Sequence, residues 1–315
     1  MVRPLFTYST AQKHKQAIVW MAYLLPSLLF YSVFMAYPLF NSIWLSFFAG
    51  EFGRLTTFVG FDNYVKLFSD PIISERYWGA FGHTWLFFTV HMFVQNVLGM
   101  IFANFLITRK LRGAKVYQTI IFIPATLSIL VTGYLWKLIL NPQWGAINLV
   151  LKSLGTENWA IPWLGDSSTA LLIVSFVSSW QWVGIPTMIF LAGFQNIPEE
   201  LYEAANIAGA TSWQIFWKIK MPLMLPIIGV VSILTFVNNF NAFDVVFAMT
   251  NVNGAPQYAT DLLGTLFYRV GIAGQHPIGI PDRGMGTAIA TVTFLILAIG
   301  VTIVMRLTRT GQEKE

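Results

Sequence analysis

Polar side chains concentrate near the end of the fifth of six long apolar runs in this 315-residue chain. Amides, a hydroxyl and a carboxylate alternate there with phenylalanines, and helical steps of three and four residues place subsets of them on shared faces. Such a surface suits a sugar, whose hydroxyl rims form hydrogen bonds and whose ring faces stack on aromatic side chains. The alternatives are that the amides join packed helices and that the carboxylate simply lies near the outer interface. The polar set is Thr235, Asn238, Asn239, Asn241 and Asp244.

Signatures of catalysis are absent from the sequence. It contains no cysteine, and therefore no disulfide, thiolate metal site or cysteine nucleophile. The phosphate-binding motif Gly-x-x-x-x-Gly-Lys-Ser/Thr, the zinc motif His-Glu-x-x-His and the nucleophile motif Gly-x-Ser-x-Gly do not occur either. His83 and His91 lie eight residues apart on one predicted helix, and we expect packing or hydrogen bonding rather than ligand binding from them. We expect a chain that is not an enzyme and holds no cofactor.

The composition indicates an integral membrane protein. Charged residues make up 10% of the chain, hydrophobic residues 56%, and the mean hydropathy is +0.62. A soluble domain carries roughly 25% charged residues, so the soluble class is excluded, and the net charge of +5 gives no reason to expect nucleic acid. A spanning helix needs about 20 mostly apolar residues, and six runs reach that length. The predicted spans cover residues 17–48, 78–106, 117–140, 170–191, 223–249 and 286–305.

The first run is predicted to be a retained helix. It is longer than the apolar core of a signal peptide, which has about 7–15 residues, and no small-residue cleavage pattern follows it. Pro26 and Pro38 are expected to kink or interrupt it, because proline removes a backbone donor. Outside the runs, the segment that begins at Gly60 and ends at Phe68 is predicted to be a short interfacial helix.

The basic residues predict the orientation. Twelve of the 19 lie in segments 1–16, 107–116, 192–222 and 306–315, which are the shorter set of connections. Lysine and arginine are enriched in cytoplasmic loops. We therefore expect six transmembrane helices with both termini in the cytoplasm.

The connection between the fourth and fifth spans, residues 193–222, is predicted to be helix, glycine turn and helix. Pro198 suits a first helical turn, and the acidic residues after it suit a helix N-terminus. Gly209 is a natural left-handed stop. Thr211 and Gln214 have the spacing of a capping box, and Pro222 is expected to end the second helix. On its pattern alone, this segment is equally compatible with an amphipathic helix that rests on lipid headgroups.

The same segment resembles the EAA loop of ATP-binding-cassette importer permeases. One face is nearly bare, and several fixed spacings over about 24 residues agree with the family pattern. The resemblance implies that this loop docks into a groove on a cytoplasmic ATPase subunit and transmits its closure. The residues that match the coupling part of the motif are Glu203, Ala204, Ala205, Gly209 and Ala210, followed by Ile219, Pro222 and Pro226.

The resemblance extends over nearly the whole chain. It is similar to the maltose-type and glycerol-phosphate-type carbohydrate permeases at Tyr23-Leu24-Leu25-Pro26, Gly60-Phe61-Asp62-Asn63-Tyr64, Arg112-Gly113 and Pro162-Trp163-Leu164. It implies an all-α membrane protein with a single permease domain, residues 1–315, in the inner membrane of a bacterium. The implied partners are a second related permease, two ATPase subunits that bind ATP and magnesium, and an extracytoplasmic solute-binding protein.

The resemblance also implies a substrate pathway. In the maltose-type permeases, contacts come from the fifth helix and from a Trp-x-Gly-x-Pro segment that matches the segment Trp182 to Pro186. Thr187 and Ala242 stand where the maltose permease has an aromatic residue and an amide, so the sugar stays open. Carried over by position, the implied contacts are Val183, Gly184, Thr187, Thr235, Asn238, Asn239 and Ala242.

Two other function classes compete with this interpretation. A self-sufficient secondary transporter should show an inverted repeat or coupling-ion carboxylates, and Asp244 is the one candidate carboxylate in the fifth span. A membrane enzyme should show a nucleophile or a metal cluster. Neither class needs a helix-turn-helix with the EAA pattern, so the sequence favours the importer permease.

Overall fold

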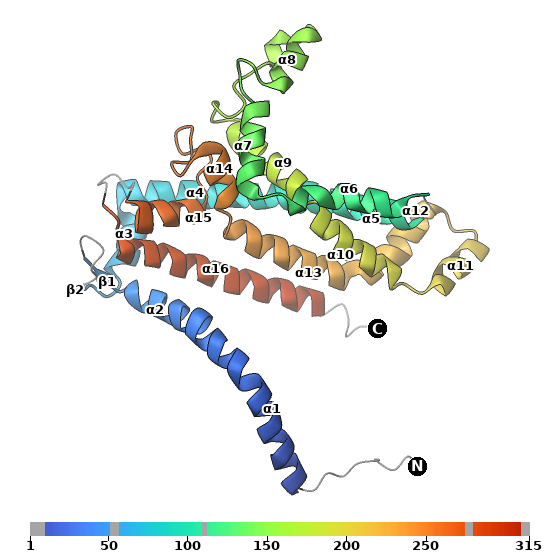
Figure 1. Cartoon of the computed structure of the whole chain (residues 1–315), viewed down its shortest axis with the longest axis horizontal. Coiled ribbons are helices and arrows are strands. Elements are labelled where there is room, and N and C mark those ends of the chain that lie inside the picture. Colours follow the sequence, from blue (N-terminus) through green and yellow to red (C-terminus); the bar gives the residue numbers. More distant parts are fainter. Residues whose placement is uncertain (1–9, 51–56, 109–111, 275–279, 310–315) are drawn as a thin grey trace.

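The computed structural model describes residues 10–50, 57–108, 112–274 and 280–309. The described chain is mostly helical, with one two-stranded ribbon. Four helices are long and apolar enough to cross a membrane, or up to six if each of two bent pairs is one span. Figure 1 shows most of them side by side along the long axis of the molecule. The four continuous ones are Val19–Leu45, Pro71–Ile107, Ser212–Phe240 and Arg283–Arg306.

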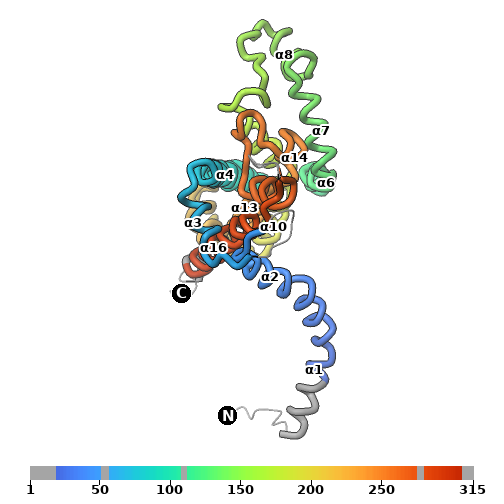
Figure 2. The backbone as a smooth tube through the Cα atoms, turned by 90° about the vertical axis from the view of Figure 1, so that its left-hand side faces the viewer, coloured from blue at the N-terminus to red at the C-terminus, as the bar shows by residue number. Residues whose placement is uncertain are grey.

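The first run is one continuous helix, so of the two expected effects of its prolines, a kink or an interruption, the structure excludes the interruption. It comprises α1 (Thr10–Tyr31), a π turn η1 (Ser32–Ala36) and α2 (Tyr37–Leu45). The π turn directly precedes the proline-containing first turn of α2, so the change in hydrogen-bond register absorbs the missing proline donor. In Figures 1 and 2, α1 curves away from the other helices. None of its most apolar stretch is buried within this chain.

The second run exceeds its predicted length and contains another π turn. Its parts are α4 (Pro71–Val90), η2 (His91–Gln95) and α5 (Asn96–Thr108). Asp70 begins it, because its carboxylate accepts hydrogen bonds from the amides of the next turn.

The third predicted span is two helices bent by 94°, α6 (Ala114–Thr126) and α7 (Ile129–Ile139). Leu127 and Ser128 between them adopt extended backbone angles. The side-chain amide of Gln181 donates a hydrogen bond to the Leu127 carbonyl at 3.0 Å, which satisfies an acceptor that the break exposes. The span predicted for residues 117–140 is thus a pair of helices with a sharp bend between them. Beyond α7 the chain continues into α8 (Ala146–Ser153) and a short 3-10 turn, η3 (Glu157–Trp159).

The fourth and fifth predicted spans are also broken. α9 (Ala170–Trp182) and α10 (Gly184–Gln195) meet at a 47° bend, where Pro186 cannot donate to the Trp182 carbonyl. α13 (Met221–Phe240) ends before residue 249, and α14 (Asp244–Thr250) follows after three non-helical residues. Asn241 promotes that break, because its side-chain amide donates to the Val237 carbonyl at 2.9 Å.

The last helices complete the bundle. α15 (Leu263–Tyr268) runs into the π turn η5 (Arg269–Ala273), and α16 (Arg283–Arg309) is the sixth predicted span. α10 packs on α5, α13 packs on α16, and α7 packs on α14. Gly99 lets α5 approach α10 closely, since a Cβ there would lie 3.2 Å from the Thr187 amide nitrogen.

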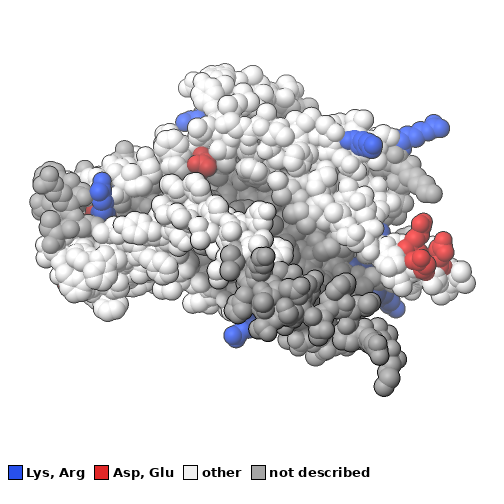
Figure 3. Space-filling view, turned by 60° about the horizontal axis from the view of Figure 1, so that its bottom comes forward, with Lys and Arg blue, Asp and Glu red and all other residues white. Residues whose placement is uncertain are grey.

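The two ends of the bundle differ. One end carries α11 (Glu199–Ile207) and α12 (Ser212–Ile215), and the other carries the ribbon, α3 (Asp62–Ser69) and the connection between α14 and α15 (Figure 1). The ribbon pairs β1 (Phe48–Ala49) with β2 (Thr57–Phe58) antiparallel, Phe48 opposite Phe58. The predicted short helix is confirmed as α3 (Asp62–Ser69). In Figure 3 the acidic side chains gather over α11, and most of the surface between the ends is uncharged.

Candidate functional site

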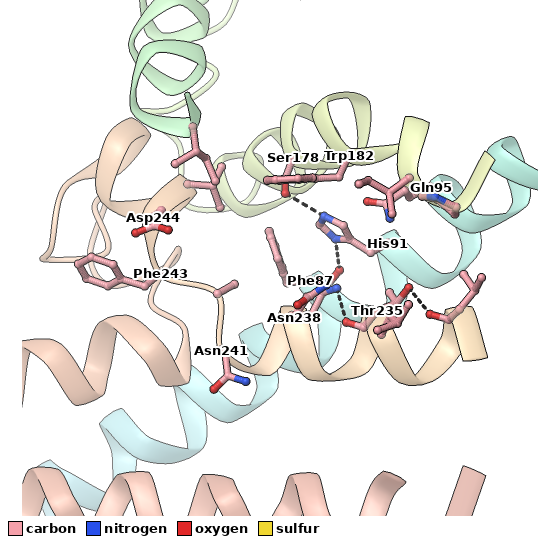
Figure 4. A pocket seen from close by; sticks show the side chains of 18 of the residues that line it. Phe87, His91, Gln95, Ser178, Trp182, Thr235, Asn238, Asn241, Phe243 and Asp244 are labelled. Carbon is pink, nitrogen blue, oxygen red and sulfur yellow. Dashed lines mark hydrogen bonds between the residues drawn. The ribbon is translucent and has the colours of Figure 1, made fainter. Parts of the chain in front are cut away.

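A cavity of about 490 Å³ opens in the middle of the bundle. Its walls come from α4 and η2, from α9 and α10, and from α13 with the break that follows it (Figure 4). Six predicted pathway residues line it, namely Thr235, Asn238, Asn239, Asn241, Ala242 and Asp244.

Helical spacing brings the α13 residues together. Thr235 and Asn238 are three positions apart and share one face of α13, and Ala242 lines the cavity from the break that follows this helix. The side chain of Asn238 is exposed, whereas that of Asn239 is 5% exposed. The Nδ2 of Asn239 donates to the Thr235 carbonyl at 2.6 Å, and its Oδ1 is buried without a partner. The Thr235 hydroxyl also bonds to Asn96 of α5.

Three predicted contacts on the fourth span lie elsewhere. Val183, Gly184 and Thr187 do not line the cavity and instead face the packing between helices. A Cβ on Gly184 would lie 2.8 Å from the Ile121 carbonyl oxygen of α6. Thr187 is fully buried, and its hydroxyl donates to the Val183 carbonyl at 2.7 Å. The helical period turns these positions away and turns their neighbours Trp182, Ile185, Pro186 and Ile189 toward the cavity.

The wall opposite α13 contains polar residues that sequence reasoning missed. His91 and Gln95 lie on the π turn η2, and Ser178 lies on α9. The Nδ1 of His91 donates to the Phe87 carbonyl at 2.8 Å, and its Nε2 lies 2.9 Å from the Ser178 hydroxyl (Figure 4). His83 is also hydrogen-bonded, its Nδ1 3.1 Å from the Asp261 carbonyl. The one sequence signal for this wall was the presence of polar residues inside an apolar run.

Among the described residues that line the cavity, one side chain is charged. Asp244 at the start of α14 is exposed, and it is the only aspartate, glutamate, lysine or arginine among the described lining residues. Across the described ranges, no three histidine, aspartate or glutamate side chains group as metal ligands would. The site therefore offers hydroxyl, amide and aromatic contacts.

The second candidate site is the connection that carries α11 and α12. Gly209 has a φ of +75°, as predicted for a left-handed stop, and the capping box between Thr211 and Gln214 forms. Glu203, Ala204 and Gly209 are exposed, and Ala205 and Ala210 are half-buried.

Pro222 does not end the second helix, so that prediction is wrong. The π turn η4 (Phe216–Lys220) joins α12 to α13. The Met221 amide donates to the Phe216 carbonyl five residues earlier, which carries the helix across the proline position. The loop predicted for residues 193–222 therefore leads into the fifth span without a break, and α10 extends into its start, to Gln195.

A buried lysine contacts several helices at the end of the molecule that carries α11, and no sequence pattern predicts these contacts. Lys220 is 7% exposed, and its Nζ donates to Asn104 Oδ1 at 2.6 Å. The Nζ also lies 5.5 Å from the ring centroids of Phe194 and Tyr202, which belong to α10 and α11. Burial raises the pKa of the Tyr202 hydroxyl, which stays neutral. Lys220 thus contacts α5, α10 and α11 from the base of α13.

Comparison with known proteins identifies the chain. A family model described as "Binding-protein-dependent transport system inner membrane component" matches residues 95–310. The chain is a permease of this family. Among similar proteins, the probable ABC transporter permease YurN of Bacillus subtilis is 33% identical over 93% of this permease and 96% of YurN. The trehalose/maltose transport permease MalF of Thermococcus litoralis is 30% identical, covering 93% and 94% of the two chains.

Other comparisons agree. The lactose transport permease LacF of Rhizobium radiobacter is 31% identical over 78% of this permease and 80% of LacF. A solved chain of a bacterial ABC transporter that imports alginate matches with a TM-score of 0.78, 22% identity and coverage of 94% and 96%. That likeness shows that the permease has the same fold.

Proposed function

We propose that this permease forms half of the translocation pathway of a binding-protein-dependent, ATP-driven importer for a sugar or related polyol. The observation that carries the proposal is the uncharged polar wall of the central cavity, where Thr235, Asn238 and Asn239 of α13 meet aromatic side chains. Similar permeases are named for the transport of lactose and of trehalose/maltose, which are ligands of this chemistry. On this proposal each bent helix pair crosses the membrane once, and six crossings leave both termini in the cytoplasm.

The proposed coupling element is the exposed end formed by α11. Glu203 offers acceptors beside the small residues Ala204, Ala205 and Ala210, and a partner surface can approach their backbone closely. We propose that this end docks on one of two ATPase subunits, which bind ATP and magnesium. ATP-driven closure of the ATPase pair then moves α11. Since α12, η4 and α13 are one continuous helix, that motion reaches the cavity wall directly.

The outer surface of the helices supports a second permease as partner. The most apolar window of the stretch Val19–Leu45 is unburied within this chain, and α1 bends away from the bundle (Figure 2), while α2 packs on α16. A second, related permease beside it is proposed to cover part of this surface and supply the other half of the pathway. A solute-binding protein is proposed to deliver sugar at the end with the ribbon and α3. One fold neighbour is a bacterial alginate ABC transporter in complex with a periplasmic protein that holds an alginate pentasaccharide.

The proposal is tested by reconstitution. The permease is co-purified with its partner permease and ATPase, placed in liposomes with the binding protein, and supplied with ATP. The expected result is ATP-dependent accumulation of a neutral sugar, and no ATP turnover by the permease purified alone. ATP-independent uptake driven by a proton or sodium gradient would contradict the proposal and favour a secondary transporter.

A further inference from the structure

The cavity wall opposite α13 is built around the π turn η2. His91 and Gln95 begin and end this turn, and both line the cavity together with Ser178 of α9 (Figure 4). π turns inside α-helices occur frequently at functional sites, because the extra residue redirects side chains out of the regular pattern. The π turn thus adds polar groups to a face that the family resemblance left unassigned.

Two side chains that line the cavity each hold a buried amide oxygen without a hydrogen-bond partner. The oxygens are Asn239 Oδ1 and Gln95 Oε1, on side chains that are 5% and 7% exposed. The orientation of the Asn239 amide is fixed, because its nitrogen must donate to the Thr235 carbonyl. Buried polar groups are normally paired. Since the cavity is the space that both side chains line, the missing donors are expected to come from what enters it.

The histidine orients a further acceptor, the Ser178 oxygen. The Phe87 carbonyl can only accept, so the neutral His91 ring carries its proton on Nδ1. Its Nε2 then accepts from the Ser178 hydroxyl at 2.9 Å. The remaining lone pairs of the Ser178 oxygen stay available. The described walls therefore present acceptors from both sides, beside the amide donors of Asn238 and Asn241.

The charged side chain among the described residues that line the cavity also favours a neutral ligand over an anionic one. Asp244 lines the cavity and is exposed, and the described lining residues include no lysine or arginine. A carboxylate or phosphate on a ligand would meet the like charge of Asp244, and no described lining lysine or arginine would compensate for its lost hydration. Neutral sugar hydroxyls supply the donors that the unpartnered amide oxygens need.

From this arrangement we infer that the permease selects neutral, hydroxyl-rich sugars over uronates, aldonates and sugar phosphates, with Gln95 as a specificity-determining residue. The inference rests on the proposed function and narrows its substrate class. It gives η2 a role in ligand selection, opposite the wall supplied by α13.

Matched sugars test the charge preference. Saturation-transfer NMR is recorded on the purified complex of both permeases and the ATPases, without binding protein, using maltose, lactose and their aldonic acids maltobionate and lactobionate. The expected result is signal transfer to at least one neutral disaccharide and at least a roughly tenfold weaker signal for its acid. An equal or stronger signal for the acids would overturn the inferred selectivity while leaving the importer proposal intact. Signal from none of the sugars, together with no sugar uptake in liposomes, would contradict the proposed function itself.

Substitution of two glutamines, one at a time, tests the role of Gln95. Gln95→Leu removes an unpartnered amide oxygen from a side chain that lines the cavity. Gln181→Leu removes a buried amide oxygen that also lacks a partner, from a side chain that does not line it. For the neutral sugar that the wild-type complex transports, Gln95→Leu is expected to raise the KM of uptake roughly threefold to tenfold. Gln181→Leu is expected to lower complex yield at unchanged KM, because its amide supports the break at Leu127. Equal KM values for both variants and the wild type would refute the role of Gln95.

Discussion

The two proposed working regions of the permease are built in opposite ways. The coupling end is a single stretch of chain, exposed and acidic, whose shape depends on a glycine turn and a capping box. The central cavity is enclosed by segments from residue 87 to residue 245 and carries one charged side chain among the described residues that line it. The continuous helix from Ser212 to Phe240 joins them. Substitutions at the coupling end should therefore alter the coupling of ATP hydrolysis to transport, and substitutions at the central cavity should alter the affinity for sugar.

The largest expected effect is at Gly209. Its φ of +75° is strained for a β-branched residue, although a Cβ there would meet no atom within 4 Å. Gly209→Val is expected to lower ATPase association and uptake by roughly tenfold or more, since such strain costs of order 1–3 kcal/mol. Gly209→Asn is the control, because asparagine tolerates this conformation. Wild-type uptake by the valine variant would contradict the docking role.

The next effect is at the helix that joins the regions. Lys220→Met removes a charged donor from Asn104 and the contacts with α10 and α11. Hydrogen bonds to charged groups are worth about 1.5–3 kcal/mol, so we expect a severalfold loss of binding-protein-stimulated ATPase activity and less sugar imported per ATP. Lys218→Met, on the same π turn but exposed, is expected to behave as wild type. Equal coupling ratios in both variants would show that Lys220 does not connect the regions.

A smaller effect is expected at Asn239. Asn239→Ala removes the unpartnered oxygen from the cavity wall, and a net hydrogen bond of this kind is worth about 0.5–1.5 kcal/mol. The KM of uptake should rise roughly threefold to tenfold, while the sugar affinity of the binding protein stays unchanged. Complex yield is measured on the same preparations. Reduced yield with an unchanged KM would show that Asn239 joins helices instead of lining the pathway.

The smallest effect is expected at Thr187, where the family resemblance implies a substrate contact. The side chain is fully buried away from the cavity, so Thr187→Val should change the KM by less than about twofold, near the lower limit of one net hydrogen bond. Pro186→Ala, at a neighbouring position that does line the cavity, provides the comparison. A tenfold rise in KM for Thr187→Val alone would restore the contact that the resemblance implied.

The contrast between the regions also explains what sequence reasoning achieved. Gly209 and the Thr211–Gln214 box were predicted because their signals are local in the chain. The α13 wall was predicted because helical spacing groups its polar residues. The breaks at Leu127 and Asn241 were missed, since apolar runs conceal them and tertiary hydrogen bonds stabilise the first. His91 and Lys220 were missed as site residues because their partners Ser178 and Asn104 lie far away in the sequence. Gln95 was missed because nothing in the apolar run indicates the π turn that positions it.

Thiol accessibility at Asn238 tests the central claim most directly, that one cavity is both the sugar site and the place that ATP-driven closure reaches. The chain has no cysteine, so Asn238→Cys provides a single reporter on an exposed cavity position. In the reconstituted complex, a membrane-impermeant thiol reagent is applied from each side, with and without transported sugar and with ATP plus vanadate. We predict protection by sugar and a switch of the reactive side on ATP trapping. Modification at one rate from one side under all conditions would contradict this claim.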